Sequence, residues 1–172
     1  NKMNLKESLT KMLRLLFFKI SREEILAFNR SDLVTGIVFT WLAGIGRYWD
    51  APSAKLLQYL GVGSLLYIFA LTFLIWLLFK PFQIKDWSYQ NLLTFISLTS
   101  APALLYAIPV ERFLSLKLSI TINAYFLLAV AAWRVALLIF YLRRFANLSR
   151  IETAIASLLP LSLIVTSLTI LN

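Results

Sequence analysis

Apolar residues fill five long stretches of the chain, and short polar segments separate them. A helix needs about 20 mostly apolar residues to cross the hydrocarbon core of a bilayer. The five stretches reach or approach this length, the first and third being the shortest. They predict an all-α polytopic membrane protein whose residues 31–172 form a five-helix transmembrane bundle. The expected spans are 33–49, 56–79, 91–108, 120–142 and 151–171.

The first thirty residues follow an amphipathic pattern instead. Their apolar residues recur every three or four positions, and the lysines and arginines lie largely off that face. The apolar set is Leu5, Leu9, Leu13, Leu16, Phe17 and Ile20, and the basic set is Lys6, Lys11 and Arg14. A basic amphipathic helix typically lies in the headgroup region of a membrane. Residues 1–30 are therefore predicted to form a cytoplasmic interfacial segment; a helix packed against the bundle is the alternative.

Caps, small residues and prolines add detail to the expected helices. Ser21 and Glu24 form a capping box, and Ser31-Asp32 is expected to cap the first span. Small residues at four-residue spacing allow another helix to approach closely; here they are Gly36, Thr40 and Gly44. The third and fifth spans should kink because proline lacks an amide N–H; these prolines are Pro102 and Pro160. The two kinks either line a cavity or serve packing alone.

Composition and charge support a membrane protein and exclude several kinds of chemistry. Hydrophobic residues make up 60% of the chain and its mean hydropathy is +0.78. The net charge is +9, but the charges lie at span ends, which favours anionic lipid headgroups over nucleic acid as partner. Cysteine and histidine are absent, so disulfides, thiol catalysis and metal binding by these residues are excluded. No metal or cofactor is expected.

The distribution of basic residues predicts the orientation. Twelve of the 17 lysines and arginines lie on the side of the N-terminus if all five stretches span. Basic residues concentrate in cytoplasmic loops, so the N-terminus is expected in the cytoplasm and the C-terminus on the other side. The compact loops suggest a bacterial cytoplasmic membrane.

One arginine, Arg134, lies near the middle of the fourth span. A charge there costs about 2.5–3.5 kcal/mol on insertion scales, so its side chain should face the bundle. Helical periodicity places Asn123 and Tyr141 on the same face. The expected partners are Asp32, Asp86, Glu152 or the carbonyl groups that Pro102 and Pro160 leave free. Arg134 is either a site for an anion or lipid headgroup, or a structural arginine that pins helices or snorkels to the surface.

Two acid–base pairs are expected on the extracytoplasmic side. Arg47 and Asp50 follow the first span, and Glu111 and Arg112 follow the third. They predict an ion-pair network between the two loops; a clamp for a zwitterionic headgroup is the alternative. Asp50 and Glu111 are the only acids expected on that side, so acid–base catalysis there would have to use them.

Part of the chain resembles a known family. Trp87-Ser88-Tyr89-Gln90 leads into a span with Ser100-Ala101-Pro102, and Arg143-Arg144 precedes a final span that contains Pro160. Over Trp87–Asn172 this pattern resembles the Yip domain family of Ypt-interacting-protein-like membrane proteins. The resemblance implies an integral membrane adaptor without established catalytic residues.

Three functions are compatible with these features. The first is a non-enzymatic membrane scaffold or accessory subunit that binds lipid and either another membrane protein or a second copy of itself. The second is a small transporter or channel subunit with an anion or lipid site at Arg134. The third, which the shortage of reactive side chains disfavours, is a membrane enzyme that acts on lipid.

Overall fold

The computed structural model describes residues 4–146, 148–149, 151–155, 158 and 162. Within residues 4–146 all regular secondary structure is helical. The α-helices are α1 (Leu5–Leu16), α2 (Arg22–Leu26), α3 (Arg30–Gly46), α4 (Leu56–Tyr59), α5 (Val62–Phe79), α6 (Tyr89–Leu98) and α7 (Leu116–Arg144). The 3₁₀ helices are η1 (Lys80–Phe82), η2 (Ala101–Ala107) and η3 (Val110–Arg112).

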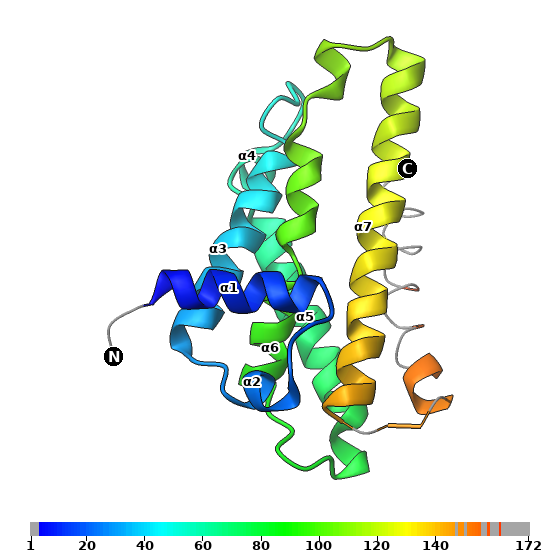
Figure 1. The fold of residues 1–172 in the computed structure, drawn as a ribbon. Helices are drawn as coiled ribbons and strands as arrows, with labels where there is room; N and C mark the ends of the chain where they lie inside the picture. Colours follow the sequence, from blue (N-terminus) through cyan, green and yellow to red (C-terminus); the bar gives the residue numbers. More distant parts are fainter. Residues whose placement is uncertain (1–3, 147, 150, 156–157, 159–161, 163–172) are drawn as a thin grey trace.

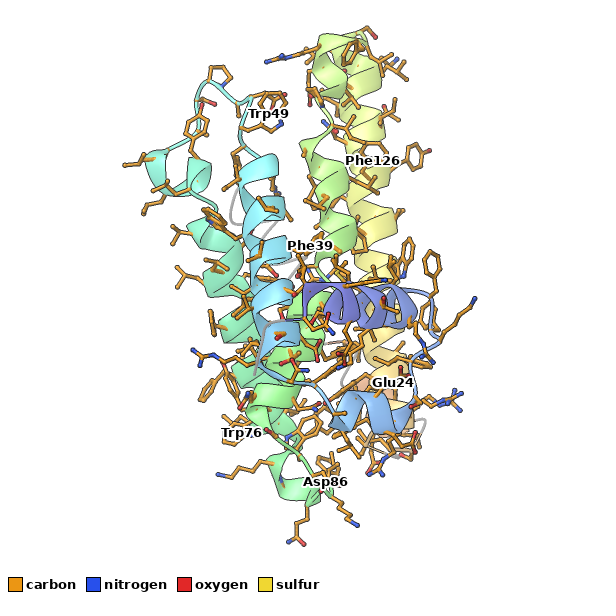
Figure 2. All side chains as sticks on the ribbon, turned by 60° about the vertical axis from the view of Figure 1, so that its left-hand side comes forward. Glu24, Phe39, Trp49, Trp76, Asp86 and Phe126 are labelled. Atoms are coloured by element: carbon orange, nitrogen blue, oxygen red, sulfur yellow. The ribbon has the colours of Figure 1, made fainter. Side chains whose placement is uncertain are left out.

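The long helices run along one axis, and α1 crosses them (Figure 1). α3 packs against α5, α6 and η2, while α7 contacts η2 and η3. The buried core centres on α6, where every residue from Leu92 to Leu98 is buried. α2, the 83–88 loop and the end of α7 lie at one end of the molecule, and α4 and η3 lie at the other (Figure 1). Trp76 and Asp86 lie near the first end, and Trp49 near the second (Figure 2).

In the part of the chain that the structure describes, three helical segments are long and apolar enough to cross a membrane. They are Val62–Phe82, Tyr89–Arg112 and Leu116–Arg144, which correspond to the predicted second, third and fourth spans. The predicted first span corresponds to α3, whose 17 residues extend about 26 Å and so fall short of a hydrocarbon core of about 30 Å. The predicted fifth span, with Pro160, lies almost entirely outside the described residues.

The predicted second span is interrupted near its start, because Gly61 separates α4 from α5. Gly61 has a left-handed backbone (φ +67°), and a Cβ there would lie 2.8 Å from the Trp41 carbonyl oxygen. The Trp41 indole Nε1–H donates to the Leu60 carbonyl, 2.8 Å away. This close contact with α3 turns the chain where the apolar pattern alone predicts a continuous helix.

The predicted third span changes helix type at its proline. α6 ends at Leu98 and Pro102 lies in the first turn of η2. Proline cannot donate to the Leu98 carbonyl, so the α-helical ladder stops there. The hydroxyl groups of Thr99 and Ser100 donate to the Ile96 carbonyl, at 2.7 and 3.4 Å. The break is therefore a transition from α to 3₁₀ geometry.

α1 packs directly on the bundle, and the face it buries agrees only in part with the predicted one, since Leu9, Leu16 and Ile20 do contact the core. Ser8, Met12, Leu15 and Leu16 are buried, whereas Leu5, Leu13 and Phe17 are exposed. The helix is rotated because Ser8 and Lys11 reach Asp32 on α3, which accepts hydrogen bonds at 2.6 Å and 3.1 Å. The exposed leucines and phenylalanine form an apolar edge on the surface of α1.

The start of α3 also differs from the prediction. Its N-cap is Asn29, whose side chain accepts from the amides of Ser31 and Asp32. Asp32 accepts in return from the Asn29 amide at 3.0 Å. The capping box therefore begins two residues earlier than the predicted Ser31-Asp32 cap. The Ser21–Glu24 capping box at the start of α2 is present as predicted.

The small residues of α3 face other helices of the same chain. A Cβ on Gly36 would lie 2.3 Å from Ser97 Oγ of α6, and one on Gly44 would lie 2.6 Å from Ser64 Oγ of α5. The Thr40 hydroxyl donates to the Gly36 carbonyl at 2.9 Å. This face of α3 is filled from within the chain, so it is not open to a partner protein.

Candidate functional site

A cavity of about 440 Å³ lies between α3, α5, α6, η2 and α7. Part of its lining comes from the two junctions at which predicted spans are interrupted. Gly61 precedes α5, and Thr99 and Ser100 occupy the junction between α6 and η2. Neither junction continues the regular surface of an α-helix, and a volume of this size is typical of a site for a small molecule.

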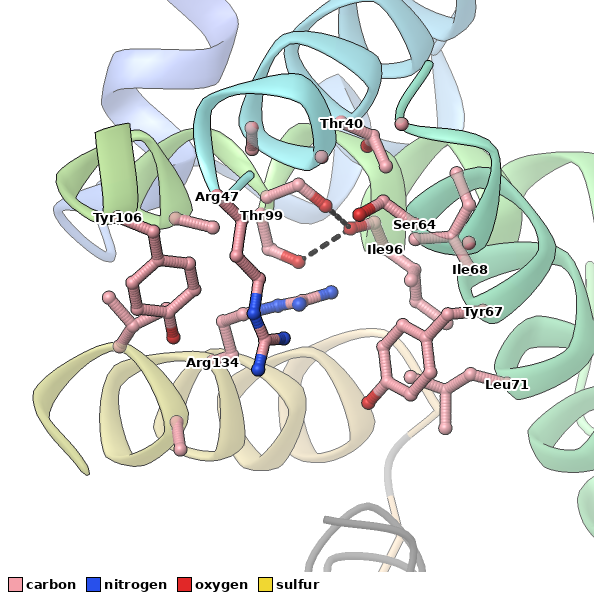
Figure 3. Close-up of a pocket in the computed structure, with 18 of the residues that line it drawn as sticks. Thr40, Arg47, Ser64, Tyr67, Ile68, Leu71, Ile96, Thr99, Tyr106 and Arg134 are labelled. Atoms are coloured by element: carbon pink, nitrogen blue, oxygen red, sulfur yellow. Dashed lines mark hydrogen bonds between the residues drawn. The ribbon is translucent and has the colours of Figure 1, made fainter. Parts of the chain in front are cut away.

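Two arginines from distant parts of the chain point into this cavity (Figure 3). Arg134 comes from the inward face of α7, and Arg47 follows the C-terminus of α3. The Arg134 guanidinium carbon lies 5.9 Å from the centre of the Tyr67 ring. The Arg47 guanidinium carbon lies 5.8 Å from the Tyr106 ring centre. Both distances are at the outer limit of a cation–π contact, so the rings orient the arginines only weakly.

Each arginine has a tyrosine ring beside it. Tyr106 lies against Arg47, and Tyr67 lies against Arg134. Figure 3 shows the two guanidinium groups between the two tyrosine rings. Two cations and two phenolic hydroxyl groups thus converge on one space.

The acids expected to pair with Arg134 have other partners. Asp32 binds Lys11 at 3.1 Å, and Asp86 lies 3.8 Å from Arg22. Glu152 accepts a hydrogen bond from the Ser149 amide at 2.8 Å. The prediction of an ion pair with one of these acids was therefore wrong, since α1 and α2 engage the two aspartates. Among the residues that the structure describes, no aspartate or glutamate lines the cavity.

The guanidinium groups are nevertheless not sealed inside protein. Within the described residues, every fully buried side-chain nitrogen or oxygen has a hydrogen-bond partner. Arg47 and Arg134 form no hydrogen bond or ion pair in that part of the chain. Arg134 is partly buried and its guanidinium nitrogen atoms keep accessible surface, whereas the Arg47 side chain is exposed. Both guanidinium groups are available to an anion that enters the cavity.

The cavity changes character along its length. Arg47, Tyr48 and Gln58 line it near the α4 end, whereas Ile75, Phe95 and Leu138 line its other end. Ile75 follows Ser64, another lining residue, by eleven positions on α5, or about 16 Å along the helix axis. A charged section therefore continues into an apolar one, a shape suited to an amphiphile.

The residues predicted to share a face with Arg134 serve separate contacts. Asn123 donates a hydrogen bond to Glu111 near the start of α7. The Tyr141 hydroxyl donates to Asn91 Oδ1 at 3.0 Å, and its ring stacks on Phe95 with the centres 4.2 Å apart. Tyr141 is fully buried and Asn123 makes an exposed contact, and only Arg134 lines the cavity.

The predicted ion-pair network between the extracytoplasmic loops is not formed. Neither Arg47 nor Arg112 pairs with Asp50 or Glu111 within the described residues. Instead the Arg112 guanidinium carbon lies 5.0 Å from the Trp49 ring centre. The Trp49 indole N–H donates to the Ala107 carbonyl at 3.0 Å. An aromatic contact thus joins the two loops. Arg47 has no acidic partner among the described residues and lines the cavity.

Sequence reasoning did not single out Tyr67 and Tyr106, and it assigned Arg47 and Arg134 to separate sites. The relevant signal was the cluster Thr99-Ser100 beside Pro102, which marks a helix break and hence a possible cavity wall. No family model matches the chain. Searches of curated proteins and of solved structures gave no match. The resemblance to the Yip domain family stays a prediction.

Proposed function

We propose that this protein is a non-enzymatic integral membrane protein that binds an anionic amphiphile from the bilayer in the cavity between α5 and α7. The observation that carries the proposal is the entry of Arg47 and Arg134 into one cavity whose described lining contains no carboxylate. Arg134 is partly buried within a candidate spanning helix, where an uncompensated charge is costly, and a bound anion supplies the missing compensation; the exposed Arg47 adds a second positive charge to the same cavity.

The chemistry of the lining favours this class of ligand. Guanidinium groups bind carboxylate and phosphate through two parallel hydrogen bonds. They are also more weakly hydrated than an ammonium group, so they lose their bound water more readily. The apolar section near Ile75 and Leu138 suits a hydrocarbon chain. Asp50 and Glu111, the residues on which an enzymatic function would depend, do not line the cavity.

The proposal includes a topology. α3 and residues 151–171 would join the three long segments to make five spans, with the N-terminal end in the cytoplasm. Support comes from the grouping of the 83–88 loop with the end of α7 at the α2 end of the molecule (Figure 1), because basic residues concentrate there. Lysine accessibility on each side of sealed vesicles would test it. As an accessory subunit, the protein would meet a partner on surfaces other than the filled glycine face of α3.

The test is the lipid that accompanies the protein during gentle extraction. Native mass spectra of the wild type should contain a bound anionic lipid, and the Arg47→Gln and Arg134→Gln variants should lose it. Arg30→Gln and Arg143→Gln are matched controls, since both side chains are exposed on the same two helical segments and lose the same charge. Equal retention by all four variants would contradict the proposal.

A second candidate is a transporter for the same amphiphile. The observation that favours it is the interruption of the third span at Pro102 beside the cavity, because substrate sites of transporters commonly lie at broken helices. In reconstituted vesicles, Arg134→Gln should then abolish lipid movement between leaflets while the thermal unfolding midpoint is retained. Equal rates in wild-type and empty vesicles would exclude transport without affecting the binding proposal.

A further inference from the structure

We infer that the headgroup recognised in the cavity is a phosphate monoester, carried by a lipid of the phosphatidate type. This inference rests on the proposed function, and it selects one chemistry among the anionic lipids. The basis is the balance of charges and donors around the cavity.

Charge is the first argument. Arg47 and Arg134 bring two positive charges, and the described lining has no acid to offset them. A phosphate monoester carries a charge of about −1.5 to −2 at pH 7, because its second pKa is about 6. A phosphodiester such as phosphatidylglycerol carries only one negative charge. Of these two headgroups, the monoester comes closer to neutralising both arginines.

The second argument concerns the ammonium group of zwitterionic lipids. Phosphatidylethanolamine and phosphatidylcholine place a cation close to their phosphate. In the described part of the cavity that cation would meet two guanidinium groups and no carboxylate. Burying like charges together is unfavourable, so these headgroups are rejected.

Hydrogen-bond donors form the third argument. Each guanidinium group offers a fork of N–H donors that matches two phosphate oxygens. The hydroxyl groups of Tyr67 and Tyr106 flank the same space (Figure 3) and add donors. A monoester presents three unsubstituted oxygens, one more than a diester, and therefore uses more of this set.

The apolar end of the cavity distinguishes a lipid from a soluble phosphate ester. Ile75, Phe95 and Leu138 offer nothing to a small polar molecule. They bury an acyl chain, which gains about 0.8 kcal/mol for each CH₂ group removed from water. Glycerol phosphate should consequently bind far more weakly than a short-chain phosphatidate.

The composition of the cavity lining makes pH a probe of the ligand. The chain contains no histidine, and the ionisable side chains of the described lining are arginines and tyrosines, which keep their protonation state between pH 5 and 8. A change of affinity across this range therefore reports the ligand's own second ionisation. If only the dianion binds, a second pKa of about 6 predicts about tenfold tighter binding at pH 8 than at pH 5.

The experiment is calorimetric titration of the whole chain in an uncharged detergent. The probes are dioctanoyl phosphatidate, dioctanoyl phosphatidylglycerol, dioctanoyl phosphatidylcholine and glycerol phosphate, each at pH 5 and pH 8. We expect phosphatidate to bind most tightly, with about a tenfold gain at pH 8, and the other affinities to be independent of pH or too weak to measure. Arg47→Gln and Arg134→Gln should abolish the pH dependence, whereas Arg143→Gln should keep it.

Each other outcome overturns a defined part of the inference. Equal, arginine-dependent binding of phosphatidate and phosphatidylglycerol would refute the monoester and leave the proposed function intact. Glycerol phosphate binding as tightly as phosphatidate would refute the lipid as source of the phosphate. Binding of neither anionic lipid, or binding that all arginine variants retain, would refute the proposed function as well. If Arg134→Gln fails to fold, Arg134→Lys keeps the charge without the fork and should weaken phosphatidate binding at least tenfold.

Discussion

The attachment of α1 to the bundle depends on Asp32, and its removal provides a quantitative test of the fold. Asp32 is fully buried and accepts hydrogen bonds from the Ser8 hydroxyl at 2.6 Å, the Lys11 ammonium at 3.1 Å and the Asn29 amide at 3.0 Å. Asp32→Ala leaves all three donors without this acceptor. We expect α1 to detach from α3 far more often in this variant.

The magnitude follows from the surroundings of Lys11. Removing one partner of a buried ion pair costs about 3–5 kcal/mol, because the other charge remains buried without compensation. Lys11 keeps Glu7 as a second partner at 3.1 Å, and its side chain is 12% exposed. We therefore expect a smaller cost of about 2–3 kcal/mol, which raises the detached population at least about 30-fold.

A cysteine reporter can measure this population, since the native chain has no cysteine. Met12 is 5% exposed on the buried face of α1, so Met12→Cys reacts with a maleimide only when α1 detaches. Asp32→Ala should accelerate this labelling at least about 30-fold. Glu7→Gln is the matched control, because Glu7 is half exposed in its pair with Lys11 and such a surface carboxylate contributes less than about 1 kcal/mol. Similar labelling rates for the two variants would refute the reasoning.

Lys11 also predicts how the attachment responds to alkaline pH. Burial lowers the pKa of Lys11, but hydrogen bonds to Glu7 and Asp32 and their charges outweigh burial, so its pKa lies above the ordinary value of about 10.4. A raised lysine pKa stabilises the fold fully below the unfolded-state value, and this contribution is lost as the pH rises through the folded-state value. The difference in melting temperature between wild type and Lys11→Met should be constant from pH 7 to 9 and shrink above about pH 10.4. A difference that persists unchanged at higher pH would contradict this.

Two further substitutions test the core, and a third serves as a control. Gly36→Leu should abolish or strongly reduce the folded yield, because even a Cβ there would lie 2.3 Å from Ser97 Oγ. Gly63→Ala is the control and should keep or raise the melting temperature, because a Cβ there meets nothing within 4 Å. Equal behaviour of the two variants would contradict the packing of α3 on α6. Tyr141→Phe removes the hydrogen bond to Asn91 Oδ1 and should destabilise the protein by about 1–3 kcal/mol, measured by detergent-titrated unfolding; an unchanged midpoint would mean that the buried amide finds another donor.

The sequence by itself determined the class of the protein. Long apolar stretches predict membrane-spanning helices because the bilayer leaves backbone groups no water to bind, and three helices of this kind are present among the described residues. Local signals were equally readable: the Ser21–Glu24 capping box is formed by residues three positions apart. Pro102 stops the α6 ladder because the missing amide is a property of the residue itself.

Tertiary structure alone decided which of these helices meet and what their polar residues do. Arg47 and Arg134 are 87 positions apart in the sequence, and no periodicity relates them; they share a cavity because α3 and α7 both pack on η2. The sequence predicts Asp32 as one partner for Arg134. In the structure the orientation of α1 places Lys11 beside Asp32 instead. Spacing along one helix fixes which side chains share a face, but the choice of partner depends on packing between helices, which the one-dimensional pattern does not contain.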